Sequence, residues 1–304
     1  MHDTRFRTML LDDVKLFFRE AGDRSLPTLL LLHGLPASSH MFRDLLGRMK
    51  NRFHLLAPDY PGFGNSEACN PQGFEYTFDR LSVVIERFLD ALGIQRMSLY
   101  MHGGGLPVGM RIAGRHPDRI TALIIQNGNC YEDGFAAATK PLFDFWYNRT
   151  PETEAAVRRF ITREGIIWQY VDGVRDRERI SPDGWMLDSA VSSQPGNGRA
   201  QLDLLYDYRK NLELYPQWQT FLREHQPPTL VLWGRNDPIY SPEGALAYHR
   251  DLNDVEFHLL DSGHFALEDC GYEIAQHVVS FLERVHEHSR DAIADVSRAD
   301  LSML

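Results

Sequence analysis

Two residues late in the sequence have the chemical types that general base catalysis needs. Asp237 follows an apolar stretch in Trp233-Gly-Arg-Asn-Asp-Pro, and His264 follows another in Asp261-Ser-Gly-His-Phe. A carboxylate bonded to an imidazole fixes its tautomer and stabilises its protonated form, so the histidine can take a proton from water. Asn-Asp-Pro is also a common turn, and the chain has 13 histidines. We nevertheless predict that Asp237 and His264 form an acid–base pair.

A third chemical position lies earlier, where the expected nucleophile is missing. The stretch Arg96-Met-Ser-Leu-Tyr-Met-His-Gly-Gly-Gly-Leu-Pro-Val-Gly-Met predicts a strand, a sharp turn and a helix. This context is typical of a nucleophile elbow, in which a Ser, Cys or Asp sits on a strained turn between small residues. Gly103 occupies the nucleophile position and has no side chain with which to attack. The sequence therefore predicts two members of a catalytic triad without the third.

The elements that must position these residues alternate between strands and helices. We predict helices near Ser39–Met49, Thr77–Leu92 and Tyr272–His286, and the second of them has apolar residues at helical spacing. Such alternation predicts an α/β fold with a mostly parallel, eight-stranded sheet, and sites collect at the carboxyl ends of its strands. The predicted strands are Phe6–Leu11, Val14–Glu20, Thr28–Leu32, Phe53–Pro58, Ser98–His102, Ala122–Gln126, Thr229–Trp233 and Val255–Leu260.

One interval breaks this alternation. Residues 131–224 contain aromatic and charged helical pieces but no strand pattern, and we interpret them as a helical cap inserted into the sheet domain. The core would then comprise residues 1–130 and 225–288, followed by a disordered tail at 289–304. Most cap aromatics are expected in the core, and the others would line a pocket between cap and sheet.

Composition excludes several functional classes. The formal net charge of −10 over 304 residues disfavours a nucleic-acid partner. Three widely spaced cysteines predict neither a disulfide framework nor a metal site, so we expect reduced thiols, no cofactor and a cytoplasmic location. No signal pattern or membrane-length apolar run is present, and no feature requires a homo-oligomer, although one is compatible with the sequence.

Taken together, the motifs resemble the α/β-hydrolase fold family, over roughly Phe6 to Val285. Within it, the likeness is greatest to the capped haloalkane dehalogenase and epoxide hydrolase branch. In that branch an Asp commonly follows the His of the elbow, where this chain has Gly103. The matching segments are His33-Gly34-Leu35-Pro36, Asp59-Tyr60-Pro61-Gly62-Phe63-Gly64-Asn65-Ser66, Leu99-Tyr100-Met101-His102-Gly103-Gly104-Gly105 and Tyr206-Asp207-Tyr208-Arg209-Lys210-Asn211.

The resemblance also implies roles for further residues. Backbone N–H groups of Leu35 and Gly104 would form an oxyanion hole. Tyr208 matches the cap tyrosine that opens epoxide rings, and a tyrosine simply packed in the cap is the alternative. We expect Tyr208, His102 and Trp146 to contact a small-molecule substrate, with His102 pointing back from the turn rather than replacing the nucleophile.

Three explanations of Gly103 remain open. The chain is a hydrolase that has lost its Asp, with reduced or atypical activity on a small apolar epoxide, haloalkane or ester. Alternatively, His264 and Asp237 act alone in a non-hydrolytic reaction, as in cofactor-independent oxygenases or lyases of this fold. The third explanation is an inactive protein that binds a small molecule. The retained acid–base pair favours the first two explanations over the third.

Overall fold

The fold is built around one twisted sheet. The structure, a computed structural model, describes residues 4–12, 14–69 and 73–301. Within these residues the strands form an eight-stranded sheet in the order β1-β2-β4-β3-β5-β6-β7-β8, which confirms the predicted α/β class. The strands are β1 (Arg5–Leu11), β2 (Val14–Ala21), β3 (Thr28–Leu32), β4 (His54–Pro58), β5 (Met97–His102), β6 (Ile120–Gln126), β7 (Thr229–Gly234) and β8 (Val255–Leu260).

The sheet is antiparallel at one edge and parallel elsewhere. β1 pairs with β2, and β2 with β4, in antiparallel register, whereas every pairing from β4 to β8 is parallel. In the parallel part, Leu30 lies opposite Leu56 on one side and Leu99 on the other. The carboxyl ends of β3, β5, β6, β7 and β8 therefore meet at one edge, where the predicted site residues follow the strands.

Helices cover both faces of the sheet, which explains the unbroken apolar runs. Leu29 and Leu31 belong to one buried cluster, with residues of α1 (Arg43–Met49) and α11 (Leu267–Leu301). Leu30 and Leu32 belong to a second cluster, with residues of α2 (Phe78–Ala91) and α3 (Gly105–Arg115). Because successive strand side chains point to opposite faces, a strand covered on both sides must be apolar throughout.

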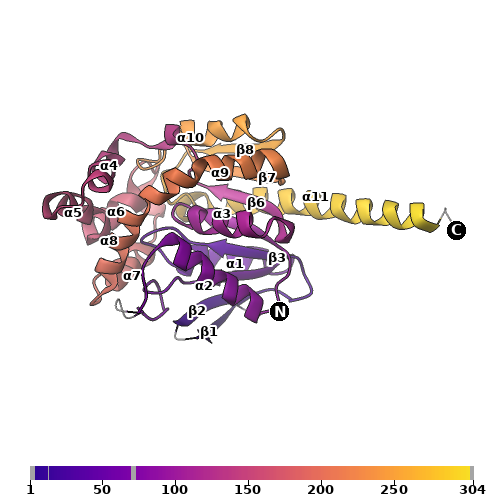
Figure 1. Ribbon diagram of the computed structural model, residues 1–304, viewed down its shortest axis with the longest axis horizontal. Coiled ribbons are helices and arrows are strands. Elements are labelled where there is room, and N and C mark those ends of the chain that lie inside the picture. The colour runs from indigo at the N-terminus through magenta and orange to yellow at the C-terminus, as the bar shows by residue number, and fades with distance from the viewer. Residues whose placement is uncertain (1–3, 13, 70–72, 302–304) are drawn as a thin grey trace.

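Helical segments, with no strand among them, fill the interval between β6 and β7. Residues 131–224, here called the cap segment, contain nearly all of this interval. Figure 1 shows α4 to α8 gathered at one end of the molecule, away from the C-terminus. The helices here are α4 (Lys140–Tyr147), α5 (Pro151–Arg158), α6 (Arg163–Val171), α7 (Pro182–Ser192), α8 (Asn197–Asp207) and α9 (Arg209–His225).

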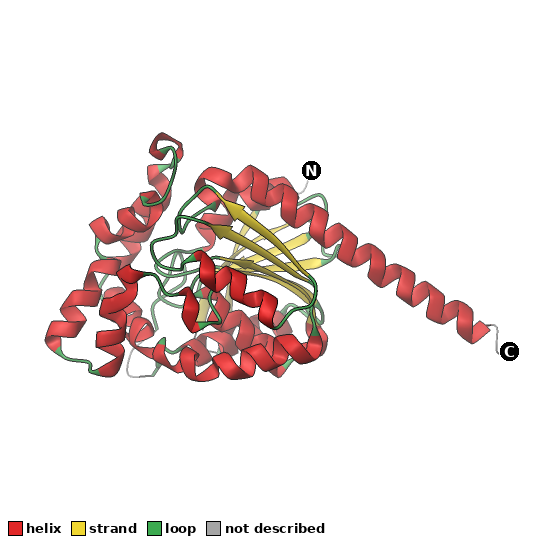
Figure 2. Ribbon diagram, turned by 90° about the horizontal axis from the view of Figure 1, so that it is seen from above, coloured by secondary structure: helices red, strands yellow, loops and turns green. Residues whose placement is uncertain are grey.

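The C-terminal helix differs from its predicted extent. α11 begins at Leu267, before the predicted start, and its backbone continues as helix to Leu301, where we expected a disordered tail. Figures 1 and 2 show its last turns projecting away from the sheet. The tail lacks an apolar stripe, so we expected it not to pack against the sheet domain. Helix formation also depends on local propensity, however, and the Ala and Arg residues of this segment favour a helix. The rest of the predicted tail, residues 302–304, lies outside the described residues. Within the described part of the chain, none of the helices combines the length and the apolar character that crossing a membrane requires.

Candidate active site

His264 and Asp237 form a buried pair at the ends of β8 and β7. Nδ1 of His264 lies 2.7 Å from Oδ2 of Asp237, and their side chains are 3% and 0% exposed. Asp237 also accepts hydrogen bonds of 2.7 Å from the Asn127 side chain and from the Ile239 N–H. When the Asp237 carboxylate accepts this bond, a neutral imidazole carries its proton on Nδ1 and has a lone pair at Nε2. This is the arrangement that a general base requires.

The turn after β5 points toward His264. Gly103 has a φ of +48°, in the left-handed region that side chains rarely adopt. A Cβ built at this position would lie 3.2 Å from Nε2 of His264. Gly105 serves packing, because a Cβ there would lie only 2.3 Å from the Leu32 carbonyl oxygen. The turn therefore has the geometry of an elbow and directs position 103 at Nε2 of His264, without a side chain there.

A cavity lies between this turn and the cap segment. The centres of water-sized molecules can occupy about 60 Å³ of it. His264 and Gly104 border it on the sheet side, and its remaining wall is mostly apolar, which suits a small, largely apolar ligand. The lining residues are Leu35, Pro36, Gly104, Phe135, Leu142, Trp146, Phe160, Ile161, Gln169, Gln201, Leu205, Tyr208, Ile239, Tyr240 and His264.

The predicted oxyanion residues meet at the same place. A Cβ built on Gly104 would lie 3.4 Å from the Leu35 nitrogen, and both residues line the cavity. Among the hydrogen bonds of the described residues, neither the Leu35 nor the Gly104 N–H has an acceptor. His33 fixes the loop that contains Leu35. Its Nδ1 donates to the Gly34 carbonyl at 2.8 Å, and its Nε2 accepts the Tyr60 N–H at 3.1 Å. Burial lowers the pKa of His33 to about 4, so this neutral, two-bond arrangement persists near neutral pH.

Tyr208 and Trp146 both line the cavity and stack on each other. Their ring centroids are 5.4 Å apart and nearly parallel, at 7°. The Tyr240 hydroxyl donates to the Tyr208 hydroxyl at 2.9 Å, and the Tyr215 hydroxyl lies 3.3 Å from the latter. Burial raises the pKa of all three phenols well above the usual value, so they stay protonated. Tyr208 can thus act as a hydrogen-bond donor in a mostly apolar wall.

His102 lies apart from the cavity, unlike the substrate contact that we expected. It is fully buried below the turn, and its Nε2 donates to the His264 carbonyl at 3.0 Å. Burial, and secondarily His264, lowers the pKa of His102 well below its usual value. The reason is directional: consecutive strand residues point to opposite sides, so the residue before Gly103 points away from the cavity. His102 therefore holds the backbone of His264 in place.

Sequence reasoning missed several residues that complete the site. Asn127 follows β6 and bonds Asp237, and the rule that sites collect at strand ends could have identified it. Tyr240 lies three residues after Asp237 and lines the cavity. Gln169 and Gln201 line it from the cap segment, and no local pattern distinguishes them from other cap glutamines.

Comparisons with known proteins agree with this geometry. The family model for the alpha/beta hydrolase fold matches residues 27–269. This chain belongs to the α/β-hydrolase family. It is 41% identical over 273 residues to uncharacterized hydrolase YNR064C of Saccharomyces cerevisiae, covering 88% of this chain and 93% of that protein. It is 28% identical to epoxide hydrolase 4 of Mus musculus, covering 76% of this chain and 66% of that one.

A solved structure extends the likeness to the whole fold. Haloalkane dehalogenase DbeA from Bradyrhizobium elkani superposes with a TM-score of 0.79 over 94% of this chain and 100% of its own, at 20% identity. At this identity the superposition supports the fold alone. This α/β-hydrolase thus has relatives named as epoxide hydrolases and dehalogenases, as the sequence motifs predicted.

Proposed function

We propose that this α/β-hydrolase binds a small, largely apolar electrophile in the cavity and hydrolyses it slowly with water activated by His264. An epoxide, a haloalkane or an ester fits this description. The observation that carries the proposal is the direction of position 103, whose Cβ would lie 3.2 Å from Nε2 of His264. Glycine puts no atoms there, so that place beside the base is left for water.

The reaction requires three contributions from the chain. Nε2 of His264 takes a proton from water while Asp237 stabilises the resulting imidazolium. The hydroxide forms a bond to the electrophilic carbon, and the bond from carbon to the leaving oxygen or halide breaks. N–H groups of Leu35 and Gly104 stabilise charge on an ester oxygen, and the Tyr208 hydroxyl does so for an epoxide oxygen.

The missing nucleophile explains why the reaction should be slow. In the enzymes that the sequence resembles, an Asp carboxylate attacks carbon and the histidine-activated water then hydrolyses the ester. Two-step nucleophilic catalysis replaces one difficult step by two easier ones. With Gly103 only direct attack by water remains, so an introduced Asp is expected to restore the faster route.

The test compares the chain with Gly103→Asp and Gly103→Asn on a panel of epoxides, haloalkanes and activated esters. Asp and Asn both tolerate left-handed backbone better than most residues and are nearly isosteric, so Asn controls for the turn. We expect Gly103→Asp to raise turnover of one substrate class by at least about 10³-fold. Equal activity of the Asn and Asp variants would contradict the nucleophilic role of position 103.

A second candidate is a non-hydrolytic enzyme that uses His264 and Asp237 alone. It is favoured by one observation, the complete acid–base pair beside an empty nucleophile position. An active glycine form that loses its reaction in both Gly103 variants and in His264→Ala would support it. Ligand binding that survives His264→Ala, without turnover by any variant, would instead identify a binding protein.

A further inference from the structure

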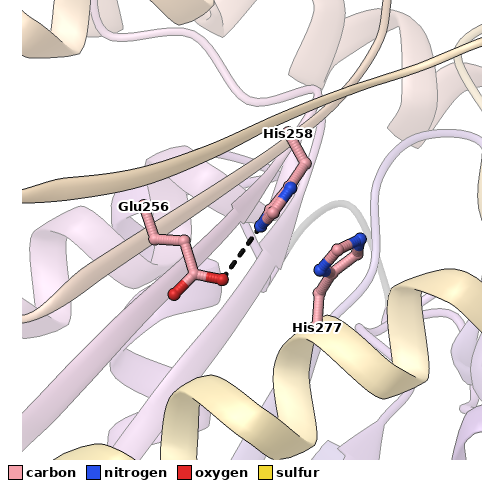
Figure 3. Close-up of side chains that lie close together, drawn as sticks. All are labelled: Glu256, His258 and His277. Atoms are coloured by element: carbon pink, nitrogen blue, oxygen red, sulfur yellow. Dashed lines mark hydrogen bonds and ion pairs between the residues drawn. The ribbon is translucent and has the colours of Figure 1, made fainter.

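A second group of histidine and carboxylate side chains lies between β8 and α11. Glu256 and His258 are two residues apart on β8, so their side chains leave the same face of the strand. His277 reaches them from α11 (Figure 3). β8 is the last strand in the sheet order, so this histidine cluster (Glu256, His258 and His277) lies at the sheet edge. None of the three residues lines the cavity.

The cluster brings three metal-ligand atoms close together. One nitrogen of each imidazole and a Glu256 oxygen all lie within 4.8 Å of one another. His258 Nε2 is 2.9 Å from Glu256 Oε1, and the two imidazole rings stack at 3.6 Å between centroids. The side chains are 26–30% exposed, so an ion from solvent can reach them.

Neighbouring charges leave one coordination side available. Arg284 pairs with Oε2 of Glu256, while Oε1 faces His258. Glu273 lies 3.7 Å from Nε2 of His277 and adds negative charge beside the histidine cluster. Because imidazole lone pairs lie in the ring plane, the two stacked rings must turn apart to direct one nitrogen each at an ion beside Oε1. The ion would then replace the hydrogen bond between His258 and Glu256 and leave the Arg284 pair in place.

We propose that the histidine cluster binds a divalent transition-metal ion, with Zn²⁺ as its first choice. Two imidazoles and one carboxylate form a ligand set that Zn²⁺ uses, with water completing a tetrahedron. Mg²⁺ and Ca²⁺ prefer all-oxygen sets and are disfavoured here. Zinc ligand bonds of about 2.0–2.2 Å require the three atoms to move closer together, which rotation of partly exposed side chains supplies. The ion would tie the edge strand to the last helix.

The test is calorimetric titration of Zn²⁺ into metal-stripped, full-length protein without a histidine tag. We expect one equivalent to bind, and His258→Ala, His277→Ala and Glu256→Gln each to weaken binding at least about tenfold. His116→Ala is the matched control, because His116 also pairs with a glutamate, Glu86 at 3.2 Å, on another surface. That variant should bind Zn²⁺ as the parent does.

Two further readouts separate binding from folding defects. The metal-free variants should melt close to the parent, and Zn²⁺ should raise the Tm of the parent and of His116→Ala but not of the His258 and His277 variants. Co²⁺ at the site should give visible absorption typical of tetrahedral coordination, which the same two variants lose. Binding that is unchanged in all three cluster variants, or equal competition by Mg²⁺, would show that the histidine cluster is only an ion-pair network.

Discussion

Two groups of residues meet at the sheet side of the cavity, here called the base side, around His264, and the elbow side, around Gly103. Only the base side has a full set of polar side chains. On the base side, Asn127, Asp237 and His264 form a continuous chain of hydrogen bonds, and His102 fixes the histidine backbone from below. On the elbow side, Gly103 has the left-handed backbone of an elbow, and a side chain at this position would point toward Nε2 of His264. Glycine, however, supplies no reactive group. The turn thus has an elbow backbone without a reactive side chain, and introducing one at position 103 tests whether it works together with His264.

The largest expected effect comes from removing the His264 imidazole in a Gly103→Asp background. Adding His264→Gln should leave the new carboxylate able to attack carbon while removing the base that hydrolyses the resulting ester. We expect turnover to fall by at least about 10³-fold and a stoichiometric covalent adduct to accumulate. Intact-protein mass spectrometry should show one substrate-derived group per chain.

The control for that experiment is the parent carrying His264→Gln alone. Gly103 cannot form an ester, so this variant should show no adduct under the same conditions. An adduct in the single variant would place a nucleophile elsewhere. If the double variant turned over substrate as fast as Gly103→Asp alone, His264 would be dispensable. The comparison of the two sides would then be wrong.

A smaller effect is expected when only the acid of the base side changes. Asp237→Asn in the Gly103→Asp background removes the acceptor that holds the proton on Nδ1 of His264. We expect kcat to fall by about 10²–10⁴-fold, since the histidine can take the wrong tautomer and its cation loses a partner. Asp261→Asn removes the same charge from an exposed side chain just after β8 and should leave kcat within about twofold. Equal losses in both variants would indicate a general charge effect.

The fold was predictable because its signals are local and repeated. Continuous apolar runs such as Thr28–Leu32 mark strands covered on both faces, and every predicted strand matches an observed one to within two residues at each end. The main difference in the described chain is α11, whose backbone stays helical to Leu301. Local propensity decided that segment, whereas the prediction relied on its lack of an apolar stripe.

The site was predictable only where residues follow strands. Asp237, His264 and Gly103 each follow the carboxyl end of a parallel strand, and these ends meet at one edge of the sheet. Tyr240, Gln169 and the contact of His102 with the His264 carbonyl depend on how the cap segment and loops pack, and no sequence period encodes that. The histidine cluster joins residues 19 positions apart in two elements, so it appeared only with the structure.

The variant Tyr208→Phe in the Gly103→Asp background tests what the cap segment contributes to the reaction. If the Tyr208 hydroxyl stabilises the opened epoxide oxygen, kcat for epoxides should fall by about 10²-fold while haloalkane turnover changes little. Tyr215→Phe is the matched control, because its hydroxyl contacts that of Tyr208 but Tyr215 does not line the cavity. Equal losses on both substrate classes would indicate that the phenol serves packing rather than chemistry.

The smallest expected effect concerns the packing behind the base. Tyr170 stacks on Phe265, the neighbour of His264, at 4.1 Å, and its hydroxyl donates to Asp188 at 2.6 Å. Burial raises the pKa of Asp188 to about 8, against the effect of this hydrogen bond. Between about pH 4 and 8 the folded state therefore holds a proton that the unfolded chain has released.

The free energy of unfolding should consequently decrease as pH rises through this window, by up to about 1.4 kcal/mol per pH unit from this one group. Asp188→Asn keeps the shape and the acceptor oxygen but cannot titrate, so its urea-unfolding free energy should change less between pH 5 and pH 8 than that of the parent. Identical slopes would mean that Asp188 is ionised in the folded protein. The Tyr170 hydroxyl would then donate to a buried carboxylate behind His264, close to the buried carboxyl group of Glu268.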